Sequence, residues 1–167
     1  MKAISLFQPW ATLVAIGAKT FETRSWETRY RGELAIHATK AMPRDARELC
    51  YQQPFFDVLH NAGYDPFNLP RGCIVAITDL LRVEPMYLYE PEELDEYNRA
   101  FGDWSLGRFA WKLVSIKRLE HPIPAKGSLG LWNWHMTPTE LAAFLDGTNR
   151  MIPVDPLMSE WYSTTKA

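Results

Sequence analysis

A nearly continuous apolar run limits the folds open to this chain more than any other feature of its sequence. The run covers residues 72–83, GCIVAITDLLRV, and is rich in β-branched side chains. Such a composition is typical of a strand buried on both faces, so we expect it inside a sheet that is covered on both sides. With 167 residues, 47% of them hydrophobic and 23% charged, the chain has the size and composition of one globular domain.

The segments around this run predict short strands and helices in irregular order. The sharpest local signal is Thr137 to Glu140, a capping box with Pro138 at the first helical position. The pattern favours an α+β fold, a small mixed β-barrel of five to six strands with short helices packed at its ends. We assign residues 1–147 to this domain and residues 148–167 to a C-terminal tail. Further strands are expected at 19–26, 32–39, 109–119 and 126–132, and helices at 8–17, within 43–63, at 91–101 and at 137–147.

Cysteine, histidine and hydropathy patterns exclude several classes of protein. Cys50 and Cys73 form no CxxC pair, and the four histidines are scattered without ligand spacing, so we expect reduced thiols, no metal and no cofactor. The apolar run before Gln8 is too short for a signal peptide. No segment reaches the ~18 apolar residues needed to span a bilayer. We therefore expect a cytoplasmic protein without membrane contact.

The charge is unevenly distributed along the chain. The net charge of −2 is not that of a general nucleic-acid binder. Residues 84–96 nevertheless carry six acids and no base, whereas residues 19–47 carry seven bases against four acids and residues 108–118 carry four bases and no acid. The sequence is therefore compatible with a local basic face.

The candidate chemistry lies between Gly17 and Trp26. Gly17 allows a sharp turn from helix to strand and brings Lys19 to that corner. On the strand, Glu22, Arg24 and Trp26 are two residues apart and share one face. An ammonium, a carboxylate, a guanidinium and an indole are thus expected to converge. Such groups can hold a nucleobase, because the indole stacks on the ring while Arg and Glu hydrogen-bond to its edge.

Structural roles are the alternative for each of these residues. Glu22 and Arg24 could form a surface ion pair worth ~0–1 kcal/mol, with Trp26 half-buried against Trp10. His37 is expected on the non-core face of its strand, where it could titrate near neutrality, or it could be a hydrogen-bonded structural histidine. Basic residues after the strand could contact phosphates or form a solvated face. The candidate ligand-binding residues are Trp10, Gly17, Lys19, Glu22, Arg24, Trp26, Arg31, His37 and Lys40.

The GxKxxExR run that starts at Gly17, together with the Gln-Pro-Trp helix before it, resembles the ASCH domain, a relative of PUA-type RNA-binding barrels. Residues 30–40, 70–83 and 109–134 also match, in the expected order, so the resemblance covers about residues 1–134. It implies a β-barrel with a cleft beside the first helix, where Lys19, Glu22 and Arg24 would lie. It also implies a role in binding RNA or modified nucleosides.

Some small ASCH members resemble amidohydrolases that deacetylate acetylcytidine with a Lys, a Thr three residues later and a Glu. Here Glu22 stands where that Thr is expected, so the covalent threonine mechanism does not transfer. If the protein is a hydrolase, we expect Lys19 and Glu22 to be catalytic, Glu22 as general base for a water and Lys19 as oxyanion partner.

Three functions follow from the sequence. The first is binding of single-stranded RNA or a nucleoside or nucleotide, with DNA left open. The second is a metal-free hydrolase, either an amidohydrolase of a modified nucleoside or a ribonuclease. The third is a protein-interaction module of the coactivator type. The sequence leaves the oligomeric state open.

Overall fold

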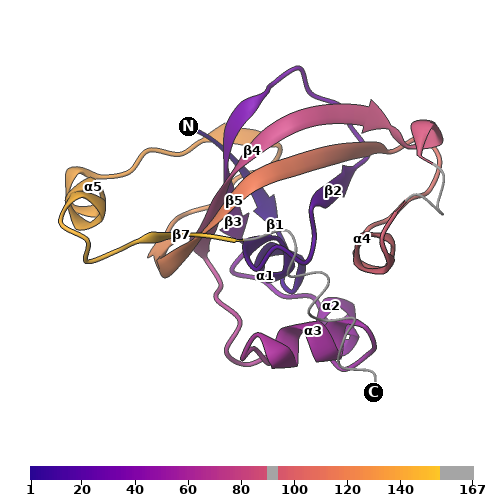
Figure 1. Cartoon of the computed structure of the whole chain (residues 1–167), viewed down its shortest axis with the longest axis horizontal. Coiled ribbons are helices and arrows are strands. Elements are labelled where there is room, and N and C mark those ends of the chain that lie inside the picture. The colour runs from indigo at the N-terminus through magenta and orange to yellow at the C-terminus, as the bar shows by residue number, and fades with distance from the viewer. Residues whose placement is uncertain (90–93, 155–167) are drawn as a thin grey trace.

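The computed structural model describes residues 1–89 and 94–154. Its described residues form one seven-stranded mixed sheet with short helices around it (Figure 1). The strands are β1 (Lys2–Leu6), β2 (Phe21–Arg24), β3 (Gly32–Ala38), β4 (Cys73–Pro85), β5 (Phe109–Pro124), β6 (Leu131–Asn133) and β7 (Met151–Pro153).

The sheet is a curled half-barrel. Six strands follow the order β2-β5-β4-β3-β1-β6, and β7 pairs with β5 outside this path. β1 is parallel to β3, and the other pairs are antiparallel. Three register shifts interrupt the β4–β5 ladder, and such irregularities bend strands and increase their twist. The predicted α+β fold, a small mixed β-barrel with short helices, is confirmed, with the sheet curled into a half-barrel.

The apolar run of residues 72–83 lies in the middle of this sheet, as predicted. It forms most of β4, which pairs with β3 on one side and β5 on the other. The side chains of residues 73–78 are all buried, whereas those of residues 81–85 are at least partly exposed. The strand is therefore covered on both faces only in its first half.

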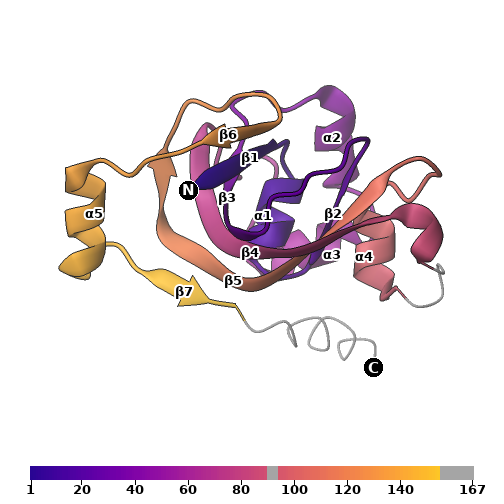
Figure 2. The ribbon, with the colours of Figure 1, turned by 90° about the horizontal axis from the view of Figure 1, so that it is seen from above.

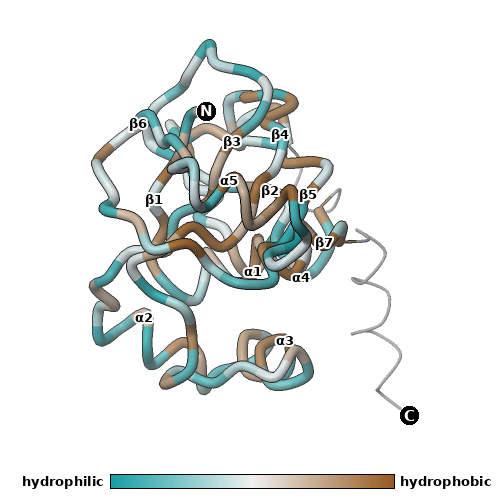
Figure 3. The backbone as a smooth tube through the Cα atoms, turned by 90° about the vertical axis from the view of Figure 1, so that its left-hand side faces the viewer, coloured by the Kyte–Doolittle hydropathy of each residue, from teal (hydrophilic) through white to brown (hydrophobic). Residues whose placement is uncertain are grey.

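The first helix, α1 (Trp10–Ala15), fills the hollow of the curled sheet. It contacts β1, β3, β4 and β5, and Figure 2 shows it inside their curve. Val14 packs in the core cluster of the sheet, whereas Leu13 packs in a second cluster with residues of three further helices, α2 (Arg44–Leu49), α3 (Phe55–Asn61) and α4 (Glu96–Phe101). Of these, α2 and α3 lie below the sheet as a separate layer (Figure 3). The remaining helical segments are η1 (Met86–Leu88) and α5 (Pro138–Leu145).

Several element boundaries differ from the sequence predictions. The helix predicted at 8–17 begins only after Pro9, and the turn after it contains Gly17 at a φ of 79°. The strand predicted at 19–26 is confined to β2, so Trp26 lies beyond its end. The strand predicted at 126–132 starts at Leu131. α5 begins as predicted, with both hydrogen bonds of the capping box between Thr137 and Glu140.

The C-terminal segment contributes a strand. β7 lies within the predicted tail and pairs with residues 117–119 of β5. Residues 155–167, and residues 90–93 of the predicted acidic helix, lie outside the described part of the chain. The domain boundary after residue 147 stays a prediction.

Both cysteines are buried as free thiols. Burial raises the pKa of Cys50 and of Cys73 to about 11, so neither is a reactive thiolate near neutral pH. Within the described ranges, no helix has both the length and the apolar character to cross a bilayer.

Candidate functional site

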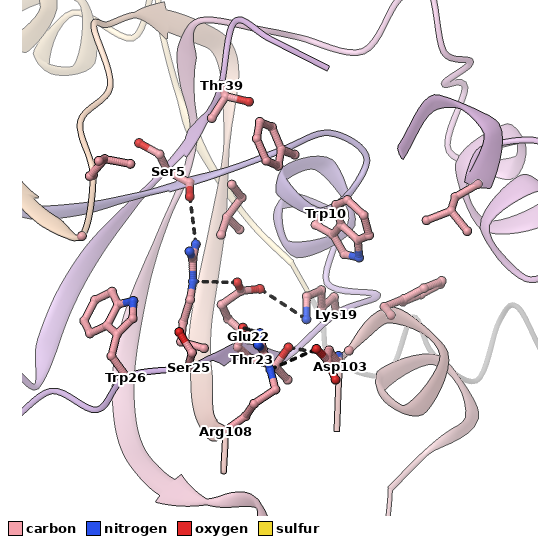
Figure 4. A pocket seen from close by; sticks show the side chains of 18 of the residues that line it. Ser5, Trp10, Lys19, Glu22, Thr23, Ser25, Trp26, Thr39, Asp103 and Arg108 are labelled. Atoms are coloured by element: carbon pink, nitrogen blue, oxygen red, sulfur yellow. Dashed lines mark hydrogen bonds and ion pairs between the residues drawn. The ribbon is translucent and has the colours of Figure 1, made fainter. Parts of the chain in front are cut away.

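A hollow of about 540 Å³ lies beside α1, between β2 and the end of β1 (Figure 4). We call it the first hollow. Most residues that line it come from β1 and α1, from residues 19–26, from the segment 100–108 and from the loop 128–130. Five aromatic side chains, those of Phe7, Trp10, Trp26, Phe55 and Phe101, form part of the lining.

The turn after α1 places Lys19 at the base of this hollow. Gly17 adopts a positive φ, and the N–H of Lys19 donates to the carbonyl of Leu13, 3.0 Å away. Lys19 is consequently 1% exposed. Its Nζ donates to the carbonyl of Phe21 and lies 3.4 Å from Oε2 of Glu22. Gly17 itself does not line the hollow, and it contributes through the turn.

Glu22 links Lys19 to Arg24. Nε of Arg24 lies 3.0 Å from Oε1 of Glu22, and its Nη2 donates to the carbonyl of Ser5 at 2.8 Å. Arg24 therefore bridges from β2 to β1 across the open side of the half-barrel. The structure brings the predicted ammonium, carboxylate and guanidinium around one hollow. We call Lys19, Glu22 and Arg24 the charged cluster.

Burial changes the titration of Lys19. Loss of hydration lowers the pKa of its ammonium, and the carboxylate of Glu22 opposes this effect in part. The positive charges of Arg24 and Arg108 lower the pKa further. Ionisable groups with shifted pKa values in a hollow are typical of functional sites.

Two charged residues of the first hollow were not predicted from the sequence. Nε of Arg108 lies 3.2 Å from Oδ2 of Asp103, and its Nη2 donates to the carbonyl of Thr23 at 3.1 Å. The backbone N–H of Asp103 donates to Oγ1 of Thr23 at 3.1 Å. The basic stretch that begins at Arg108 was the one signal in the sequence for this pair.

The two tryptophans lie on different sides of the charged groups. In Figure 4, Lys19 and Glu22 lie between Trp26 and Trp10. The half-buried ring of Trp26 packs edge-on against Trp111 with centroids 4.7 Å apart, not against Trp10. Trp26 lines the hollow from the segment after β2, because the strand ends at Arg24.

Three other candidates lie outside the first hollow. His37 and Lys40 line a neighbouring hollow of about 830 Å³, which we call the second hollow. Arg31 lines neither, and its Nη1 donates to the carbonyls of Thr28 and Tyr30.

His37 is buried rather than placed on an open face of β3. It is 2% exposed, with Nδ1 3.1 Å from Oγ of Ser5 and Nε2 3.0 Å from the carbonyl of Ala125. Because that carbonyl can only accept, Nε2 carries the proton, and Nδ1 is an acceptor that shares the one hydroxyl proton of Ser5 with the carbonyl of Ser128. Burial lowers the pKa of the imidazole, against the opposing hydrogen bond to Ala125. Of the two predicted roles, His37 therefore has that of a hydrogen-bonded structural histidine.

The site offers polar groups for binding and a carboxylate–amine pair for proton transfer. Among residues 1–89 and 94–154, no three His, Cys, Asp or Glu side chains are grouped to hold a metal ion. The Nε atoms of Arg24 and Arg108 are buried, and neither has a hydrogen bond of good geometry to the described residues. Both residues line the hollow, and each Nε lies beside a carboxylate, that of Glu22 or of Asp103.

The fold and the site together define a small α+β domain with one curled sheet, a helix inside it and a ligand-sized hollow where that helix leads into an edge strand. The ASCH domain family matches residues 4–123, most of the chain, and the chain belongs to this family.

Part of this chain is similar in sequence to known proteins. Human activating signal cointegrator 1 is 38% identical to it over 81 residues, and the mouse protein of that name is 37% identical over 79 residues. Each match covers 47% of this chain and 13% of the relative. The chain thus corresponds to a small part of these relatives. The crystal structure of ASCH from Zymomonas mobilis aligns with a TM-score of 0.50 and 15% identity, over 90% of this chain and 96% of that one, which bears on the fold alone.

Proposed function

We propose that the protein binds RNA or a nucleotide-like ligand in the first hollow. The observation that carries this proposal is the charged cluster at the base of an aromatic-lined hollow. A volume of about 540 Å³ lies within the range of roughly 300–1,000 Å³ typical of small-ligand sites. A nucleobase could stack on an indole while a guanidinium and a carboxylate hydrogen-bond to its edge.

Energetics support a functional role for the charged cluster. Burying charges costs several kcal/mol per ion, and a buried ion pair is often no more stabilising than an apolar replacement. The ammonium of Lys19 is fully buried beside Glu22, which is 8% exposed. A fold could fill this position with apolar side chains, so the charges are better explained by recognition of a polar ligand.

Tryptophan fluorescence tests this function directly. A ten-nucleotide single-stranded RNA of mixed sequence should quench the fluorescence, and the affinity should fall as salt rises. Arg24→Gln should weaken binding about tenfold, whereas Arg44→Gln, which removes an exposed charge on α2, should not. Wild-type protein that binds neither this RNA nor the four nucleoside monophosphates would contradict the proposal.

A hydrolase is the second candidate, and the carboxylate of Glu22, 3.4 Å from the amine of Lys19, favours it. In this reaction Glu22 takes a proton from water, and the resulting hydroxide attacks the acyl carbon while Lys19 stabilises the oxyanion. The C–N bond then breaks, and the proton passes from Glu22 to the leaving nitrogen. The threonines beside Lys19 are already engaged, since Thr20 accepts from Asn98 and Thr23 from Asp103.

Turnover of acetylcytidine or RNA by metal-free protein, lost in Lys19→Ala and in Glu22→Gln while circular dichroism shows a folded chain, would establish the hydrolase. No turnover and no nucleotide binding would leave a protein-interaction module, in line with the similarity to activating signal cointegrator 1. A cytoplasmic location stays a prediction, which cell fractionation would test.

A further inference from the structure

The second hollow adjoins the first and shares a wall with it. Its volume is about 830 Å³, and it lies over the ends of β1 and β3 and the loop 125–129. Both hollows are lined by the same five residues, which we call the shared ridge: Ser5, Phe7, Thr39, Ser128 and Leu129. A ligand that crosses the ridge would occupy both hollows.

The two hollows differ in charge. The charged residues that line the first hollow are Lys19, Glu22, Arg24, Asp103 and Arg108, and each takes part in an ion pair. The second hollow is lined by Lys40 and Lys126 and by no carboxylate. Both lysines are exposed, and neither makes a hydrogen bond or ion pair with the rest of the described chain. The first hollow therefore suits an uncharged polar ring, and the second suits an anion.

The shared ridge presents apolar surface between the hollows. Phe7 is 45% exposed and Leu129 is 96% exposed. Exposed apolar side chains between a polar aromatic hollow and a basic one can support a sugar or the face of a base. The order aromatic hollow, shared ridge and basic hollow matches the order base, sugar and phosphate within one nucleotide.

The loop that forms the ridge is anchored on one side by a neutral network. Oγ of Ser5 donates to the carbonyl of Ser128 at 3.0 Å and accepts from Nε1 of Trp132 at 3.2 Å. Nε2 of His37 bonds to the carbonyl of Ala125. A Cβ added at Gly127 would lie 2.3 Å from Cε1 of His37, so the loop packs directly on the imidazole. These contacts give the shared ridge a defined position.

We propose that the two hollows form one groove for a nucleotide unit of a single-stranded nucleic acid. A base lies in the first hollow, and the adjoining phosphate lies between Lys40 and Lys126 in the second. This inference rests on the proposed function and narrows it, because a free nucleoside would leave the second hollow empty. His37 serves the groove as a positioning residue for the loop 125–129.

Fluorescence anisotropy tests whether the ligand occupies both hollows or the first hollow alone. The probe is a 5′-fluorescein-labelled ten-nucleotide RNA, with DNA of the same sequence to show which sugar is accepted. The best nucleoside monophosphate should compete at least tenfold better than its nucleoside, which lacks the phosphate. Lys40→Gln and Lys126→Gln should each weaken decamer binding roughly fivefold and reduce the slope of log K against log salt by about 0.7, the value for one phosphate contact on a single strand. Lys117→Gln, an exposed β5 residue outside both hollows, is the matched control.

The outcomes distinguish this inference from the function on which it rests. Tight binding of either decamer, with the two lysine effects and an unchanged control, supports the groove. If nucleosides compete as well as nucleoside monophosphates and both lysine variants bind like wild type, the groove is refuted and a site for the base alone remains. If wild-type protein binds no decamer and no nucleotide, the proposed function fails as well.

Discussion

The two walls of the first hollow are held in place by different kinds of contact. On the β2 side, the charged cluster joins the turn after α1 to β2 and β1 through ionised groups. On the opposite side, Ser5, His37 and Trp132 hold the loop 125–129 through neutral hydrogen bonds and close packing. One wall depends on charge balance, and the other depends on shape and on the protonation of one imidazole.

This difference determines which substitutions destabilise each wall. Removing one member of a buried ion pair leaves a charge without a partner, which is among the largest single-residue penalties in proteins. A neutral network loses less when one hydroxyl is removed, but it does not tolerate added volume. The variants below exploit these differences, starting with the strongest.

Glu22→Gln should have the largest effect. The change leaves the buried ammonium of Lys19 without a carboxylate, so we expect the free energy of unfolding to fall by about 3 kcal/mol, measured by urea denaturation. Glu48→Gln on α2 is the control, because its pair with Arg44 is exposed and worth ~0–1 kcal/mol.

A double variant shows whether the loss comes from the unpaired charge. Lys19→Met combined with Glu22→Gln should recover more than half of the stability lost in Glu22→Gln alone, because no buried ammonium then remains. Equal stability of the single and double variants would mean that the charged cluster does not behave as a buried ion pair.

Gly127→Ala should have the next largest effect on stability. Its new methyl group would lie 2.3 Å from the ring of His37 and 2.8 Å from Oγ of Ser5, so the loop must shift. We expect a loss of about 1–3 kcal/mol in unfolding free energy, with weaker RNA binding in the anisotropy experiment. Ser128→Ala, on the same loop, keeps the carbonyl that Ser5 uses and should remain near wild type.

Ser5→Ala tests the hydrogen bonds of the neutral wall. The change removes the hydroxyl that serves His37, Trp132 and the carbonyl of Ser128, and should cost about 1–2 kcal/mol. The control is Ser25→Ala, an exposed residue that lines the first hollow. Equal denaturation midpoints for the two variants would assign no stabilising role to the network.

The pH dependence of stability should be the smallest effect. The pKa of His37 is lowered by burial, so the unfolded chain binds more protons below the ordinary value of 6.5. Its contribution to stability is complete above about pH 6.5 and is lost as the pH falls toward the lowered folded pKa. His37→Gln keeps a donor for Ala125 but does not titrate, so its urea midpoint should fall less between pH 7 and pH 5. Parallel pH curves for both proteins would contradict this.

Local patterns in the sequence predicted the fold where one strong signal acted alone. The capping box at Thr137 and the apolar run of β4 are such signals. The extension of β5 to Pro124 was not predictable, because Ser115 adopts a φ of 51° and register shifts interrupt the alternation. β7 depends on pairing with a distant strand, and nothing in its own three residues indicates this.

The site likewise combines residues that a local pattern predicts with residues that only distant contacts bring together. Lys19, Glu22 and Arg24 are close in sequence, so a turn and a strand suffice to predict their convergence. Asp103 and Arg108 meet Thr23 across 80 and 85 residues, which only the tertiary fold can determine. His37 and Lys40 line the second hollow together with the loop 125–129. No local pattern in the sequence shows that this loop packs against β3.

The position of β2 gives its charges another consequence. β2 is four residues long and lies at the end of the sheet's strand order, so one of its edges has no neighbouring strand within that order. Short edge strands with inward-pointing charges discourage two sheets from joining edge to edge. Glu22 and Arg24 therefore also guard against self-association, and neutral substitutions that preserve stability should make the protein more prone to aggregate.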